Sequence, residues 1–202
     1  MAAFFGNLRN VVIAGFVLAI GVAAIYVGCL HGSLDPAFWA FVTRWLHAAC
    51  GVMWIGLLWY FNFVQVPTMP KVPAELKGGV TGYIAPAALF WFRWSALFTV
   101  LMGLILAYSR GFLLQALTLG LTEHPMAPGH AFIGLGMWLG IIMMLNVWGA
   151  IWPAQKIALG IVEADADAKA AAGRKGMIFS RINTFLSVPM LVTMTMNQTI
   201  FG

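Results

Sequence analysis

The sequence has very few charged residues. They make up 8% of the 202 residues, whereas a soluble domain carries about 25%. So few charges cannot cover the surface of a soluble enzyme. The net charge of +5 does not indicate nucleic-acid binding either, because the basic residues are scattered in loops between apolar runs.

Cysteines and recognisable catalytic motifs are also scarce. Cys29 and Cys50 are the two cysteines and both lie in apolar segments, which argues against a disulfide framework. There is no Cys-x-x-Cys-His motif, so a c-type haem is not attached to this chain. A nucleophile elbow, a phosphate-binding loop, a zinc-protease motif and an internal repeat are likewise absent.

Long hydrophobic runs are what the sequence has, since 62% of its residues are hydrophobic. A membrane span needs about 20 consecutive apolar residues. We therefore predict an all-α fold, a polytopic membrane helical bundle of about five transmembrane helices, and read the first apolar segment as a retained span. The expected spans are residues 11–30, 38–66, 87–108, 131–152 and 182–201.

The segments between the spans predict the domain organisation and the orientation. We expect a single integral membrane domain over residues 1–202, with a loop at 72–86 and an extramembrane helical arm at 154–181 that is rich in alanine and charge. Basic residues mark the cytoplasmic side of a membrane protein. They gather before the first span, in the second-to-third loop and in the arm, so the N-terminus is predicted to be cytoplasmic and the C-terminus outside.

Polar residues recur every three or four positions along the second span, which places them on one helical face. Ionisable side chains in a span are costly and usually functional, so this face is expected to meet the bundle interior or a cofactor. The alternative is a packing stripe with interhelical hydrogen bonds. The face comprises Arg44, His47, Gly51, Trp54, Leu58, Asn62 and Gln65.

His47 is the leading candidate for a ligand. A neutral imidazole binds haem iron or a transition metal, and Gly51, one turn away, leaves space for a flat macrocycle. His130 opens the fourth span at a similar depth and shares its face with Gly134 and Met137. The two histidines predict a bis-histidine site for haem b, although His130 is also typical of a helix start at the interface.

Three further groups bear on this site. Arg44, one turn from His47, is placed to pair with a haem propionate or an anionic substrate, or else to reach the headgroups. His31 and His124 lie in the predicted outer loops, so the four histidines also permit a copper or zinc site.

Small and sulfur-containing residues mark the last two spans. Gly136 and Gly140 predict close helix packing. A stripe on the fifth span contains methionines that are able to ligate haem or copper, although such stripes are more typical of packing. The stripe comprises Asn183, Ser187, Met190, Met194 and Asn197.

Several segments together resemble a known family. They are Trp45-Leu46-His47 followed by Gly51 to Gln65, Trp91-Phe92-Arg93-Trp94, Asn146-Val147-Trp148, Ile151 to Lys156, Ser180 to Thr184 and Ser187 to Met190. The chain resembles the membrane domain of the bacterial cytochrome-c-linked urate oxidases. More loosely, the Leu-His and Trp-x-Gly of the second span resemble the small haem-binding membrane proteins related to protoporphyrinogen oxidase, in which the span histidine is a proposed ligand.

The resemblance implies a haem-binding redox protein of the bacterial cytoplasmic membrane, with His47 as haem ligand. Because the chain shows no cytochrome c domain, electrons are expected to leave through a separate c-type cytochrome or another membrane subunit. Two alternatives remain: a non-catalytic subunit of a larger respiratory or oxidase complex, and a small metal- or solute-handling membrane protein.

Overall fold

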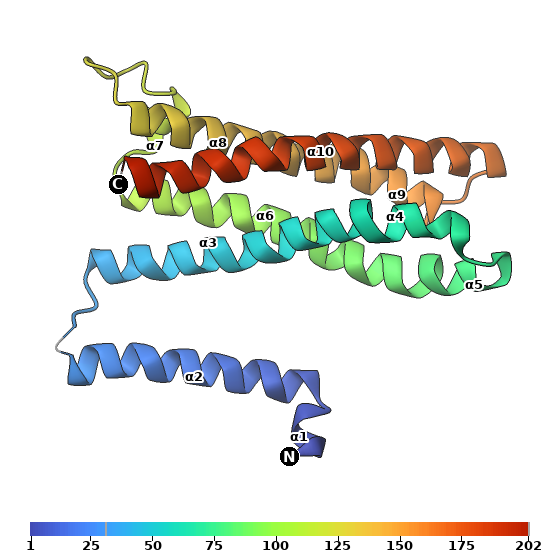
Figure 1. Ribbon diagram of the computed structural model, residues 1–202, viewed down its shortest axis with the longest axis horizontal. Helices are drawn as coiled ribbons and strands as arrows, with labels where there is room; N and C mark the ends of the chain where they lie inside the picture. The colour runs from blue at the N-terminus through green and yellow to red at the C-terminus, as the bar shows by residue number, and fades with distance from the viewer. Residues whose placement is uncertain (31, 202) are drawn as a thin grey trace. The chain divides into compact units, whose positions relative to one another are not determined.

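The computed structural model describes residues 1–30 and 32–201, which contain helices and no strand (Figure 1). Five of the helical stretches are long and apolar enough to cross a membrane, so the predicted all-α membrane fold is confirmed. These stretches are Leu8–Cys29, Pro36–Lys71, Ala74–Ser109, Pro128–Ala158 and Ala166–Ile200.

The elements follow one another along the chain, with the longest connection between helical stretches lying between Leu117 and Pro128. The α-helices are α1 (Ala2–Phe5), α2 (Leu8–Cys29), α3 (Pro36–Trp59), α4 (Val66–Thr68), α5 (Ala74–Gly79), α6 (Ala85–Ser109), α7 (Leu113–Leu117), α8 (Pro128–Asn146), α9 (Trp152–Ala158) and α10 (Ala166–Ile200). Three π-helical segments, η1 (Tyr60–Gln65), η3 (Val80–Ile84) and η4 (Val147–Ile151), and one 3₁₀ turn, η2 (Met69–Lys71), continue these helices.

The chain divides into two compact units, Met1–Phe41 and Val42–Gly202. The first contains α1, α2 and the start of α3. Asn7 caps α2 by accepting hydrogen bonds from the backbone N–H groups of Arg9 and Asn10. No residue of α2 is buried, as expected for an apolar helix whose side chains face lipid. The second unit is the helical bundle that holds the candidate site.

Three of the long helices extend past the ends that the sequence predicts. Residues 74–86, expected to belong to a loop, are helical, and the second and fourth spans continue beyond Pro67 and Pro153. Each of these two prolines, and Pro86, is the second residue after a π-helical segment. A helical proline lacks an N–H and clashes with the carbonyl four residues earlier. The wider π turn shifts that carbonyl, so the helix continues through the proline.

The segment 154–181 comprises the end of α9, a connection and the beginning of α10. Asp165 caps α10 by accepting a hydrogen bond from the Ala168 N–H at 2.7 Å. From this cap, α10 runs as one helix to Ile200 and packs along α8 and α9 (Figure 1). The arm and the fifth predicted span are therefore joined in one long helix.

A polar clamp pins α10 to its neighbours. Asn183, fully buried, donates from Nδ2 to the Met143 carbonyl at 2.8 Å and accepts at Oδ1 from Asn146 Nδ2 at 3.0 Å. Nearer the start of α10, the Ser180 hydroxyl accepts a hydrogen bond from Asn62 Nδ2 of η1 at 2.8 Å. Helices in lipid gain little from the hydrophobic effect, so such bonds and close packing hold the bundle together.

Replacing Asn183 with alanine is expected to lower the free energy of unfolding by about 1–3 kcal/mol, because the half-buried Asn146 amide and the buried Met143 carbonyl each lose an interhelical hydrogen bond. Thermal unfolding in detergent measures the change. Thr184→Ala is the matched control, since within the described part of the chain the Thr184 hydroxyl bonds only the Ser180 carbonyl of its own helix. Equal effects of the two substitutions would contradict the clamp.

Candidate functional site

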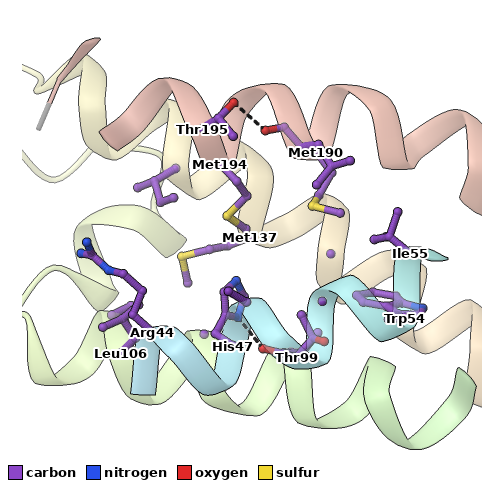
Figure 2. A pocket seen from close by; sticks show the side chains of 18 of the residues that line it. Arg44, His47, Trp54, Ile55, Thr99, Leu106, Met137, Met190, Met194 and Thr195 are labelled. Atoms are coloured by element: carbon purple, nitrogen blue, oxygen red, sulfur yellow. Dashed lines mark hydrogen bonds between the residues drawn. The ribbon is translucent and has the colours of Figure 1, made fainter. Parts of the chain in front are cut away.

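A cavity of about 660 Å³ lies within the bundle, between α3, α6, α8 and α10 (Figure 2). Its volume is in the range of about 300–1,000 Å³ that is usual for small-molecule and cofactor sites. Most of its walls are apolar side chains. The first part of the polar face predicted on the second span opens onto it, because Arg44, His47, Gly51 and Trp54 are among the lining residues, whereas Leu58, Asn62 and Gln65 are not.

His47 is half-buried, and its ring orientation is fixed by α6. Its Nδ1 lies 2.7 Å from the Thr99 carbonyl oxygen. Since a carbonyl can only accept, Nδ1 carries a proton, and in the neutral imidazole Nε2 then keeps its lone pair. Figure 2 shows Nε2 turned away from Thr99, toward the side of the cavity where Met137 and Met194 lie. Histidine ligands of metals usually donate their other N–H to such an acceptor.

A glycine of α6 makes this position possible. A Cβ added at Gly103 would lie 2.9 Å from both Cε1 and Nδ1 of His47. The ring thus rests on the backbone of α6, one turn after the carbonyl that it bonds.

One end of the cavity is polar and positively charged. Arg44 is exposed and carries the only permanent charge among the described residues that line the cavity. Thr195, Gln198 and Thr199 of α10 are also part of the lining. At the other end, Trp54 is 1% exposed, and its indole N–H finds no hydrogen-bond partner in the described part of the chain. The cavity is therefore amphipathic, with a cation and hydroxyls at one end.

Three methionines contribute sulfur to the cavity lining: Met137 from α8, and Met190 and Met194 from α10. Figure 2 shows the sulfur atoms of Met137 and Met194 on the side of the cavity opposite Thr99. The fifth-span stripe thus contributes cavity-lining methionines, which its helical spacing alone could not show.

His130 lies elsewhere. It does not line the cavity; its Nδ1 is 2.9 Å from both carboxylate oxygens of Glu123. Its ring stacks on Phe112, a lining residue, with 5.8 Å between centroids. The space expected beside it at Gly134 is filled, because α7 packs there and a Cβ at Gly134 would collide with the Ala116 carbonyl. Close packing is also seen at Gly136, but Gly140 lines the cavity instead.

The four-histidine metal site receives no support from the described residues. His31 lies outside them. Within them, no group of three or more histidine, cysteine, aspartate or glutamate side chains is arranged to hold a metal ion. Sulfur from methionine and nitrogen from His47 are the soft donors that the cavity offers.

Residues 109–201 match the family described as urate oxidase N-terminal. Over these residues the match confirms the resemblance to a urate oxidase membrane domain. The matched range contains Asn146, Asn183 and all three cavity methionines, whereas His47 and Arg44 precede it. No curated protein and no solved structure matches the chain.

Proposed function

We propose that the chain is a haem-binding membrane redox protein, in which His47 ligates the iron of one b-type haem held in this cavity. The observation that carries the proposal is the orientation of His47. Its Nδ1 proton is engaged by the Thr99 carbonyl, which leaves the Nε2 lone pair for a metal. Burying an imidazole in a span is costly unless it has such a role.

The other lining residues fit a haem. The apolar walls suit the macrocycle, and Gly51 and Gly140 keep side chains out of the cavity. The two propionates need a polar, cationic end, and Arg44 with the side-chain amide of Gln198 provides lining groups that can donate to them. A bound haem would supply a one-electron redox centre.

The resemblance to a urate oxidase domain supports a role in substrate oxidation or electron transfer. Electrons would then pass to a separate acceptor, a c-type cytochrome or another membrane subunit. The amphipathic cavity favours this redox function over that of a non-catalytic subunit, which would need no cofactor-sized space.

The test is an optical spectrum of the protein purified in detergent after expression with haem supply. A reduced-minus-oxidised spectrum with b-type bands and about one haem per chain is expected. A protein that is folded, judged by its thermal unfolding, and still takes up no haem would overturn the proposal.

We further propose that the N-terminus is cytoplasmic and that the Arg44 end of the cavity faces the outside of the bacterial inner membrane. Single cysteines in a chain lacking Cys29 and Cys50 test this orientation. Leu34→Cys is expected to react with a membrane-impermeant maleimide from outside, and Ala171→Cys only after lysis; both positions are exposed. Labelling of Ala171→Cys in intact cells would reverse the assignment.

A further inference from the structure

The proposed haem site raises the question of the second axial ligand, and four side chains are candidates: His130, Met137, Met190 and Met194. A second ligand must approach the iron from the side opposite His47. The ring of His47 rests on α6, at Thr99 and Gly103. The ligand is therefore expected on the wall across the cavity from α6.

His130 does not meet this requirement. Phe112, which lines the cavity, is stacked on its ring, and α7 packs against α8 at Gly134. The Nδ1 proton of His130 is engaged by Glu123. Reaching a haem beside His47 would require Phe112 to move and α7 to separate from α8.

Two of the methionines are held in packed clusters. Met190 is 7% exposed and belongs to the core cluster around Trp54, Leu58 and Phe92. Met137 of α8 is 8% exposed and belongs to a second core cluster with Ala107 of α6, Ala116 of α7 and Ile133 of α8. Both also line the cavity, and a move toward the iron would cost either side chain part of this core packing.

Met194 is positioned differently. It is half-buried, packs at the edge of both clusters and comes from α10, across from α6 (Figure 2). Its side chain lies on Gly136 of α8, where an added Cβ would be 3.2 Å from Met194 Cγ and 3.3 Å from its Cε. His47 and Met194 thus share an arrangement: each lies on a glycine of a neighbouring helix and each contributes to the cavity lining.

We infer that Met194 is the second axial ligand, an inference that rests on the proposed haem site. Its thioether sulfur would donate a lone pair to the iron opposite His47 Nε2, with no bond broken and no proton moved. Histidine–methionine ligation raises the reduction potential of a haem relative to bis-histidine ligation. The site would therefore favour the reduced state and suit an acceptor of high potential.

The experiment compares Met194→Leu, which conserves volume but removes sulfur, with Met190→Leu on the same helix. The wild type is expected to show the far-red sulfur-to-iron charge-transfer band of oxidised histidine–methionine haem, by absorption and magnetic circular dichroism. Met194→Leu should keep its haem through His47 but lose this band, and its midpoint potential should fall. Met190→Leu should retain both. Met194→His should give a six-coordinate spectrum without the band and a lower midpoint than the wild type.

Haem content, measured as the pyridine complex, distinguishes a failure of the proposed haem site from a failure of the Met194 assignment alone. A wild type without haem would overturn the haem site and the ligand together. Haem bound normally, with the band and midpoint unchanged in Met194→Leu, would overturn the ligand assignment alone. Loss of the band in Met137→Leu, but not in Met194→Leu, would also overturn it and assign the ligand to Met137. A wild type that binds haem without showing the band would overturn it as well, and the spectrum of His130→Ala would then show whether His130 is the ligand.

Discussion

Replacing His47 with alanine is expected to abolish haem binding by the purified protein. The substitution removes the imidazole whose orientation is fixed by the 2.7 Å contact with the Thr99 carbonyl. Loss of an outer-shell partner of a metal ligand already costs roughly 10–100-fold in affinity, so loss of the ligand itself should exceed roughly 100-fold. Titration of the apoprotein with haem, followed at the Soret band, measures this change.

Two further variants test whether the effect is specific to the ligand. His47→Gly leaves space for free imidazole, and added imidazole should restore the bound haem if a ligand, rather than the fold, was lost. His130→Ala should bind haem like the wild type, because His130 lies outside the cavity lining. Full haem with an unchanged spectrum in His47→Ala would exclude His47 as the ligand.

The sequence predicts the membrane helices well, because long apolar runs with few charges have few other solutions. Their ends are predicted less well. Pro67, Pro86 and Pro153 look like helix breaks, yet each follows a π-helical segment that accommodates it. The choice between a break and a widened turn depends on how the helix packs, which proline itself does not encode.

The helical spacing also predicts which residues of the second span line part of the candidate site. Arg44, His47, Gly51 and Trp54 were expected on one face, and all four line the same cavity. What the spacing cannot provide is the neighbouring α6 backbone on which the His47 ring rests. The Thr99 acceptor is a backbone carbonyl, and Gly103 contributes by having no side chain, so neither has a recognisable signature within an apolar span.

The proposed pairing of His47 with His130 illustrates a related limit. Similar depth in the membrane and a nearby glycine suggested a shared site for the two histidines. In the structure, α7 fills the space at Gly134 and Phe112 stacks on the His130 ring. A short helix in a connector is enough to separate two residues at similar predicted depth.

Gly103→Ala is expected to lower haem affinity by roughly 10–100-fold, the usual effect of disturbing what orients a metal ligand. A Cβ there would lie 2.9 Å from two atoms of the His47 ring. The ring must then shift away from α6, and because the Thr99 carbonyl is on the same helix, the shift disturbs the hydrogen bond that orients the ring. Haem titration measures the affinity, and the midpoint potential reports any change in the ligand that remains.

Gly56→Ala is the matched control for this substitution. Gly56 also lines the cavity, but a Cβ at this position has nothing within 4 Å. Alanine is favoured over glycine in a helix by up to about 1 kcal/mol, so Gly56→Ala should unfold at a temperature no lower than that of the wild type. The same is expected of Gly103→Ala, unless the contact of its Cβ with the His47 ring destabilises the fold. If Gly103→Ala binds haem as tightly as Gly56→Ala, the ring does not rest on α6 in the haem-bound protein. If only Gly103→Ala loses haem while remaining folded, the backbone of α6 is what holds His47 in its ligating orientation.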